Sequence, residues 1–515
     1  MAGLDDQTPF LFRDSTDKAT FDDAVWGRVF NHRRDRLREP LAVCRARIVA
    51  DVVAAVELGR ERNCRVSVRS GGHAWAAWSV RHGAVLVDLA DLVDADGSRI
   101  SYDEDTQVVS CSPSTTGEAL NTFLSAVDGG KGRMFAGGHC PDVGLGGFLL
   151  QGGMGWNCKN WGWACESILA VDVVTADARP LRCSTAEHAD LFWAARGAGP
   201  GFPAIVTRFH LATRPATQLY QSLYMFPIAD FRPALQWVVD LCCCSSVSNL
   251  APLSSHHNSH TPQLSPTADA DTEIVVVTSC LSPSDETPTV LANLTTFKPS
   301  LAAAQAALQP IHDSLPSTLS PSATVFCQHT TLAAEYGKQR AANPEGHHYI
   351  SDNAYVVADG TADIDIAELL AGPFTALPTR KACALWFSMA PTAQRALPDM
   401  ALSLHSEHYV ALYAVWEGGT DPAAGSSPSA GKDDDGERCA AWVANAMAGI
   451  ERHSVGSYLG DADFQVRRTR FWSEGAGQRV RAVRRAWDPA GRICGFLDVG
   501  DASGVDGLRN EFEWL

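Results

Sequence analysis

Apolar residues recur with two different spacings in the first ninety positions of the chain. Four valines between positions 49 and 56 follow an i, i+3, i+4, i+7 spacing, which predicts an amphipathic helix within residues 47–60 that ends near Asn63. Short apolar runs at 66–68 and 84–89 predict strands on either side of a glycine-containing loop. This order of helix, strand, loop and strand predicts a small α/β lobe.

A second lobe is predicted from about residue 108 onward. The apolar run 108–112 predicts a strand, and the segment 115–118, Thr-Thr-Gly-Glu, predicts a capping box for the helix that carries Leu120 and Leu124. Residues 168–175 and 204–211 alternate as strands around a helix containing Phe192 and Trp193.

The pattern changes near residue 216 to strands with helices between them. Residues 273–280 and 409–416 predict strands, and Gln478 to Trp487 predicts a helix that Asp488-Pro489 stops. Three segments without periodicity interrupt or precede these elements: a loose N-terminal arm (1–24), a Ser/His/Pro-rich loop (251–271) and a charged linker (418–438).

Length and charge restrict the class of protein. The 515 residues suffice for two to four domains, and a net charge of −17 argues against nucleic-acid binding. No apolar run reaches the ~18 residues of a membrane span, and the acidic N-terminus lacks the apolar core of a secretory signal. We therefore expect a cytoplasmic protein whose 15 cysteines are mostly reduced thiols.

Two glycine-rich turns carry the candidate chemistry. The first, 69–73, reads Arg-Ser-Gly-Gly-His, and the second, 137–141, reads Gly-Gly-His-Cys-Pro. Glycines let the backbone adopt positive φ and bring several N–H groups to one point, which suits a diphosphate. Glycine runs at 144–147 and 152–155 would let a flat ligand lie on the backbone. These features together predict a site that holds a large planar cofactor bearing phosphate and bonds to it.

Four sequence blocks carry a resemblance to a known family. The blocks are 69–75, 138–155, 173–177 and 190–197. In this order they resemble the flavin domain of the vanillyl-alcohol-oxidase (PCMH-type) superfamily, and more narrowly the berberine-bridge-enzyme-like FAD-linked oxidases of fungal type. The resemblance implies an α+β fold in which a two-lobed FAD-binding domain is joined to a substrate domain with an antiparallel sheet backed by helices.

The resemblance also implies a domain division and a doubly attached cofactor. We expect an N-terminal arm (1–34), the FAD domain (35–215), the substrate domain (216–450) and a C-terminal segment (451–515) that returns to the FAD domain. The histidine matching His73 bonds to the 8α-methyl of FAD in the family, and the cysteine matching Cys140 bonds to its C6. The residues expected to bind the cofactor are His73, Cys140, Arg69, Ser70, Gly71, Gly72, Ala74, Gly138, His139, Val143, Gly144, Gly147, Gly152, Gly153, Gly155, Trp156, Ile205 and Val206.

The catalytic base is predicted less directly. The family often has Tyr-x-Asn before its final helix; this chain keeps Tyr458 but has Gly460 in place of the asparagine. Glu407 and Tyr409 lie on the strand expected to line the substrate side, and either could serve as the base with a suitably tuned pKa. The three candidates remain open at this point.

The predicted function is that of an FAD-linked oxidase. A hydride passes from an alcohol or a secondary-metabolite intermediate to flavin N5, and O2 reoxidises the flavin to give hydrogen peroxide. In the family a small residue at the position of Val143 goes with oxygen access. The alternatives are a cyclase or pericyclase on the same fold, and a dehydrogenase with another acceptor. No metal is expected, because Cys158 and Cys165 lack a second pair.

Overall fold

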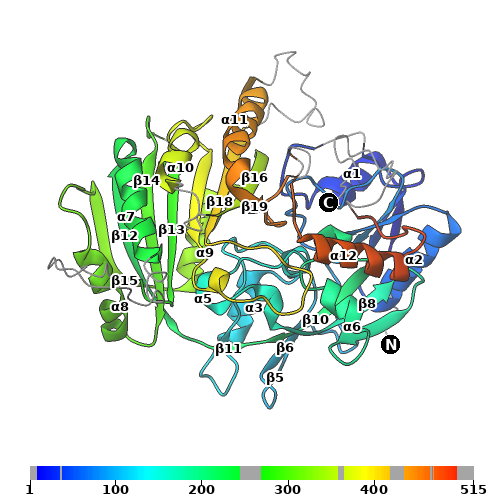
Figure 1. Ribbon diagram of the computed structural model, residues 1–515. Helices are drawn as coiled ribbons and strands as arrows, with labels where there is room; N and C mark the ends of the chain where they lie inside the picture. Colours follow the sequence, from blue (N-terminus) through cyan, green and yellow to red (C-terminus); the bar gives the residue numbers. More distant parts are fainter. Residues whose placement is uncertain are drawn as a thin grey trace.

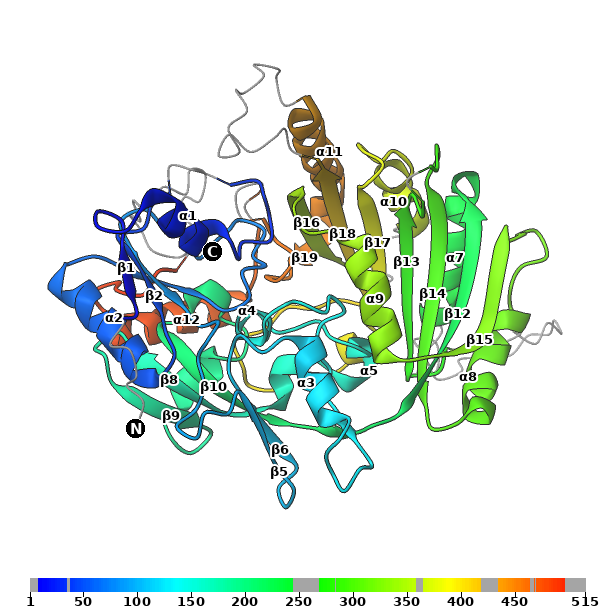
Figure 2. The same cartoon turned by 180° about the vertical axis from the view of Figure 1, so that it is seen from behind.

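The described part of the chain forms a four-stranded, a five-stranded and an eight-stranded β-sheet and one two-stranded pair. Figures 1 and 2 show them from opposite sides. The computed structural model describes residues 8–34, 38–243, 268–282, 284–357, 365–417, 434–463, 467 and 469–495. The architecture is α+β, as predicted: two smaller sheets form one side of the molecule, and the largest sheet with its helices forms the other.

The first sheet has the strand order β1-β2-β4-β3. Its strands are β1 (Phe10–Phe12), β2 (Ala42–Arg45), β3 (Val66–Arg69) and β4 (Val85–Asp88). Strands β2 and β3 both run parallel to β4, and helix α2 (Val49–Glu61) packs Val52 and Val56 into the core of this sheet. The predicted helix and both predicted strands are confirmed.

The N-terminal region is not a loose arm, contrary to prediction. Strand β1 pairs antiparallel with β2, and helix α1 (Lys18–Trp26) buries Phe21, Val25 and Trp26 against the same sheet. A helix of only nine residues with a weak apolar stripe gives little periodic signal, so its burial depends on tertiary packing.

The second sheet is antiparallel throughout, with the order β5-β6-β10-β8-β9. Its strands are β5 (Ile100–Asp103), β6 (Val108–Cys111), β8 (Ile168–Thr175), β9 (Pro180–Ser184) and β10 (Ala204–Ala212). Helices α3 (Gly117–Leu124), α4 (Leu145–Leu150), α5 (Cys158–Trp161) and α6 (Ala189–Ala194) lie between or beside these strands. The cap of α3 is Thr116, whose hydroxyl accepts the N–H of Ala119, so the predicted capping box does not form.

The largest sheet has eight antiparallel strands in the order β15-β12-β14-β13-β17-β18-β16-β19. The two-stranded pair, β7 (Arg133–Met134) with β11 (Arg214–Pro215), leads into it. The eight strands are β12 (Gln218–Pro227), β13 (Thr272–Ser279), β14 (Thr289–Lys298), β15 (Ala323–Thr330), β16 (His348–Val356), β17 (Cys383–Ser388), β18 (His408–Trp416) and β19 (Ser454–Gly456).

Helices cover one face of this sheet (Figure 1). The covering helices are α7 (Phe231–Cys243), α8 (Leu301–Asp313), α10 (Ile366–Thr375) and α11 (Asp434–Ile450). Because side chains alternate across a strand, Val410, Leu412 and Ala414 of β18 face these helices, whereas Tyr409 and Tyr413 point to the opposite face. That opposite face looks toward the glycine-rich loops. Helix α9 (Leu332–Ala342) lies apart, against α3.

The chain then returns to the first half of the molecule, as the resemblance implied. Helix α12 (Glu474–Trp487) packs against α6 (Figure 1), and Ile493 pairs with Val66 of β3. The predicted linker 418–438 is shorter than expected, since α11 begins at Asp434; most of that linker and of the predicted loop 251–271 lies outside the described residues.

Candidate active site

The first glycine-rich loop begins where β3 ends, and Arg69 fixes that end. Its buried guanidinium donates to the Asp88 carboxylate at 2.6 Å and to the carbonyls of Ala24 and Val25 near the end of α1. Because all of these partners are protein groups, Arg69 supports the loop from behind. A side chain that binds the cofactor would have to face an open site. The Arg69 side chain does not, so the prediction that it contacts the cofactor is not supported.

The loop 69–73 and the turn at 142–146 lie back to back. A Cβ on Gly71 would lie 2.5 Å from the nitrogen of Gly144, and a Cβ on Gly72 would lie 1.8 Å from the carbonyl oxygen of Arg28. Gly72 also has a φ of +82°. Glycine is therefore required at both positions by the close approach of two backbones.

This loop leaves several hydrogen-bond donors without a protein acceptor. Among the described hydrogen bonds, none uses the backbone N–H of Gly71, Gly72 or His73, and all three residues are half-buried. Nearby, the buried hydroxyls of Ser112 and Thr115 also lack a partner within the described structure. Converging N–H and O–H donors are what a diphosphate requires.

His73 points from this loop toward the second one. Its ring stacks on Phe30 with centroids 4.3 Å apart, and its Nε2 lies 3.4 Å from a carboxylate oxygen of Asp142. Asp142 comes two residues after Cys140. His73 thus contacts the segment that directly follows Cys140. Ala74, next to His73, is exposed.

Cys140 is half-buried in the second loop, between two carboxylates. Burial, followed by the nearby charges of Asp142 and Asp461, raises the pKa of its thiol to about 12. Such a thiol stays protonated at neutral pH and is not spontaneously reactive. Cys140 therefore requires an electrophile brought directly to it.

His139 connects the FAD side to the largest sheet. Its Nε2 lies 2.9 Å from a carboxylate oxygen of Glu273 on β13, and the other oxygen accepts the N–H of Asn157 at 2.7 Å. Burial alone would lower the pKa of His139, but the Glu273 carboxylate raises it overall. The ring also packs against Trp156, with centroids 4.3 Å apart. These contacts give His139 a structural role at the junction with the largest sheet, and its predicted contact with the cofactor stays a prediction.

The later glycines mostly serve packing inside the protein. A Cβ on Gly153 would meet Phe148, one on Gly155 would meet the carbonyl oxygen of Ala136, and one on Gly152 would meet Leu402. Around Gly147, by contrast, no heavy atom lies within 4 Å of a Cβ, and the residue is exposed.

The remaining predicted cofactor residues support the site through their backbones or their burial. Gly138 bridges to Gly155. Val143 is half-buried beside the central core. Ile205 and Val206 place their side chains in the cores on opposite sides of β10, so neither side chain lines an open hollow.

Asp461 was missed as a site residue. Its carboxylate accepts a hydrogen bond from the Tyr409 hydroxyl at 2.6 Å, and the polar side chains of Tyr413 and Trp75 lie near it. Burial raises the pKa of Asp461, although these donors oppose the shift. In the sequence, Asp461 stands two positions from Asp463, and no local signal separates their roles.

The three predicted base candidates have different surroundings. Tyr458 is buried, and its oxygen accepts the N–H of Met154 at 3.1 Å. Tyr409 is buried and bound to Asp461. Glu407 accepts a hydrogen bond from Gln394 at 2.7 Å in a separate contact, and its role as the base stays a prediction.

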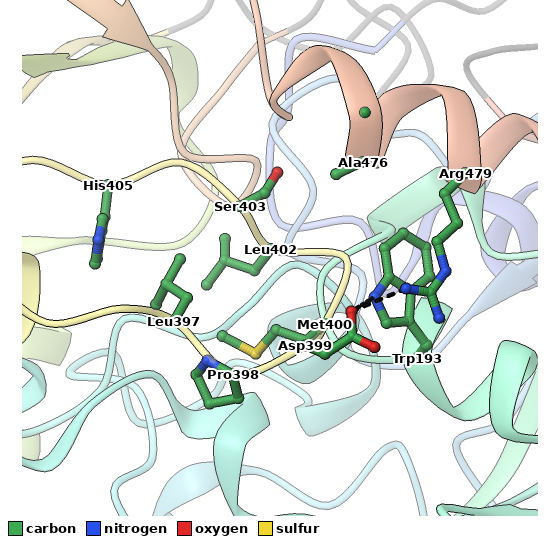
Figure 3. A pocket seen from close by; sticks show the side chains of 11 residues that line it. Trp193, Leu397, Pro398, Asp399, Met400, Leu402, Ser403, His405, Ala476 and Arg479 are labelled. Carbon is green, nitrogen blue, oxygen red and sulfur yellow. Dashed lines mark hydrogen bonds and ion pairs between the residues drawn. The ribbon is translucent and has the colours of Figure 1, made fainter.

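A surface pocket of about 460 Å³ lies elsewhere, between the segment 397–405 and helix α12 (Figure 3). Asp399 there accepts hydrogen bonds from Trp193 at 2.8 Å and Arg479 at 2.9 Å, and the Arg479 guanidinium stacks over the Trp193 ring. These residues bond to one another, and the pocket shares no residue with the two glycine-rich loops.

Other kinds of site are not found in the described part of the chain. The described residues contain no group of three potential metal ligands, and their cysteines form no disulfide. None of the described helices has the length and apolar character to cross a membrane.

The loops and their unpaired donors fit the diphosphate of FAD, and comparisons with known proteins agree. Residues 40–184 match the family described as "FAD binding domain". The fold and the site thus define an FAD-dependent oxidoreductase.

The chain is 36% identical to the FAD-linked oxidoreductase nodO of Hypoxylon pulicicidum, over 95% of this chain and 97% of that protein. It belongs to the family of fungal FAD-linked oxidoreductases.

Two solved structures share the fold. BBE-like 1 of Physcomitrella patens matches with a TM-score of 0.73 and 15% identity, covering 94% of this chain and 95% of that one. The glucooligosaccharide oxidase of Acremonium strictum matches with a TM-score of 0.66 and 19% identity over 94% of each chain, and its description names a 6-S-cysteinyl, 8α-N1-histidyl FAD.

Proposed function

We propose that this enzyme holds FAD by two covalent bonds, from His73 to the 8α-methyl and from Cys140 to C6, and works as an oxidase. Bound there, the flavin supplies the capacity to accept a hydride and to pass two electrons to O2, which gives hydrogen peroxide. The proposed substrate is an alcohol or a secondary-metabolite intermediate.

The observation that carries this proposal is the placement of His73 and Cys140. The loop that ends in His73 lies back to back with the turn 142–146 that follows Cys140, and a carboxylate oxygen of Asp142 lies 3.4 Å from Nε2 of His73. Both attachment side chains are half-buried, so each retains surface on which a ligand can be contacted. The glucooligosaccharide oxidase with the same fold provides a precedent for the double linkage.

This chain's own residues would do the holding and orienting. The N–H groups of Gly71, Gly72 and His73 are available to bind the diphosphate. Trp75, Tyr413 and Phe387 supply aromatic surface near the attachment residues, which favours a substrate with a substantial apolar part.

Acid precipitation tests the double linkage. The precipitated wild-type protein should be yellow, and mass spectrometry of its peptides should find flavin on both His73 and Cys140. Each single variant, His73→Ala or Cys140→Ala, should retain colour through the other bond, and the double variant should release it. Yellow colour in the wild-type supernatant would contradict the covalent linkage.

Reoxidation distinguishes the oxidase from the alternatives. Enzyme reduced with dithionite without air and then mixed with aerated buffer should regain its absorbance within seconds and release one hydrogen peroxide per flavin. Slow reoxidation would instead support a dehydrogenase with another acceptor. Turnover of a substrate without oxygen uptake would support a cyclase.

A further inference from the structure

Asp461 has surroundings that set it apart from the neighbouring carboxylate. Asp463 is buried and forms an ion pair with Arg33 at 2.7 Å, so its charge is balanced. Asp461 appears in none of the ion pairs found among the described residues. Its carboxylate is instead held by a neutral donor, the hydroxyl of Tyr409, with Tyr413 and Trp75 nearby.

Neutral donors and an ion pair have different chemical consequences. A carboxylate in an ion pair is committed to its cation, and protonating it costs the energy of that pair. A carboxylate held by neutral donors can also be ionised, because these donors stabilise its charge. It then accepts a proton without leaving an unpaired buried cation. Asp461 keeps some accessible surface, so a substrate group can approach it.

Asp461 lies beside the proposed flavin attachment. Its negative charge raises the pKa of Cys140 and of His139 in the second glycine-rich loop, and that of Tyr413 on β18. A chain of aromatic contacts also leads from His73 through Phe30 and Trp75 to Tyr413. The carboxylate and both attachment residues therefore belong to one cluster.

We propose that Asp461 is the proton-accepting residue of this active site, with Tyr409 positioning its carboxylate. The inference rests on the proposed function. As the substrate O–H bond breaks, its proton moves to the Asp461 carboxylate. The C–H bond breaks with both electrons leaving as hydride, for which a bound flavin would supply the acceptor, and the alcohol becomes a carbonyl compound.

Tyr458 is less suited to this task. Its oxygen already accepts the N–H of Met154, and burial, followed by the nearby charge of Asp461, raises the pKa of its phenol. A phenol in that state holds its proton at working pH. Tyr458 therefore packs beside Asp461 and does not replace it.

Other titratable groups face Asp461, and their contributions to the pH dependence must be distinguished from that of its carboxylate. They are Tyr409 and Tyr413 of β18, Tyr355 of β16, Tyr458, and His139 and Cys140 of the second loop. Of these, His139 could also titrate near neutral pH, since its pKa is raised by Glu273. Variants at position 461 isolate the contribution of the carboxylate.

Sulfite provides a test that needs no substrate. It binds oxidised flavin as an anion, and binding is read as loss of visible absorbance. The holoenzyme, Asp461→Asn, Tyr458→Phe and the matched carboxylate control Glu407→Gln would be titrated with sulfite across a range of pH. Comparing variants at each pH cancels the titration of sulfite itself.

The expected result is specific to position 461. At high pH, Asp461→Asn should bind sulfite at least about tenfold more tightly than the wild type, since a nearby negative charge has been removed. That difference should vanish as the pH falls and Asp461 becomes protonated in the wild type. Tyr458→Phe and Glu407→Gln should follow the wild-type curve. With an alcohol that releases peroxide, Asp461→Asn should slow anaerobic flavin reduction by about 10² to 10⁴-fold.

Two kinds of failure remain distinguishable. If the wild type carries no covalent flavin, the proposed function fails. If flavin is present but Asp461→Asn follows the wild-type sulfite curve, or if Tyr458→Phe removes the pH-dependent step, only the assignment of Asp461 is overturned. Should Asp461→Asn not retain flavin, Asp461→Ala would be titrated with and without formate, whose carboxylate should restore wild-type behaviour.

Discussion

The hydroxyl oxygen of Tyr409 lies 2.6 Å from a carboxylate oxygen of Asp461. Tyr409 sits on β18, on the face of the largest sheet that the helices leave uncovered, and Asp461 follows β19 at the edge of the same sheet. The contact therefore holds the loop 457–463 against the sheet. It also places the Asp461 carboxylate on the face of the sheet that looks toward the second glycine-rich loop.

Tyr409→Phe should raise the pKa of Asp461. The hydroxyl donates to the charged form of the carboxylate, so its loss favours the protonated form. A hydrogen bond to a charged group contributes about 1.5–3 kcal/mol, which corresponds to a shift of roughly one to two pH units. The pH-dependent step in sulfite binding should move upward by that amount, and an unchanged step would show that Tyr409 does not position Asp461.

Glu273→Gln should destabilise the protein more at low pH than at high pH. Because Glu273 raises the pKa of His139 in the folded protein, the stabilisation is complete below the ordinary histidine pKa and is lost as pH rises through the raised value. Removing one partner of a largely buried pair costs about 3–5 kcal/mol.

Thermal unfolding of the wild type and Glu273→Gln, compared near pH 6, below the ordinary histidine pKa, and near pH 9, well above it, checks this prediction. The difference in melting temperature should be larger at the lower pH. It should not disappear at the higher pH, because Glu273 also accepts the N–H of Asn157. A difference that grows with pH would contradict the assigned sign.

Gly72→Ala should disrupt the first loop. The added methyl would lie 1.8 Å from the carbonyl oxygen of Arg28, at a φ of +82° that alanine disfavours. The backbone conformation alone costs about 1–3 kcal/mol, and the clash adds to it. Gly475→Ala is the matched control, because a Cβ there meets nothing within 4 Å and the residue lies in helix α12.

Melting temperature and flavin content report the effect of both glycine variants. Gly72→Ala should lower each of them. Gly475→Ala should leave flavin content unchanged and raise stability by up to about 1 kcal/mol. Equal behaviour of the two variants would show that the close approach to Arg28 does not constrain the loop.

Val143→Leu should slow the reaction of the reduced enzyme with O2. Val143 is half-buried three residues after Cys140, at a position where the family resemblance associates a larger side chain with exclusion of oxygen. Reoxidation measured after dithionite reduction should slow by at least about tenfold, the effect of a barrier increase near 1.4 kcal/mol. Covalent flavin content serves as the control and should stay at the wild-type level.

The sequence predicted much of the fold because short-range patterns control it. Local spacing alone identifies these elements. It is seen in the valines of α2 and in the apolar runs of β3, β4, β8 and β10, and it does not depend on which segment covers the buried face. The sequence signal was weaker for α1 and β1. Their apolar residues are few, and only contact with β2 and its neighbours makes them part of the core.

The sequence also predicted only some of the residues of the candidate site. By itself the sequence singled out His73 and Cys140, because glycine-rich turns that end in reactive side chains are a local signal. It could not rank Asp461, Asp463 and Glu407, which are ordinary acidic residues when read along the chain.

Only the tertiary structure separated these three carboxylates. Folding brings Arg33 to Asp463, Gln394 to Glu407, and two tyrosines and a tryptophan to Asp461. The ionisation of a carboxylate depends on burial and on partners that come from distant segments, and periodicity carries no information about them.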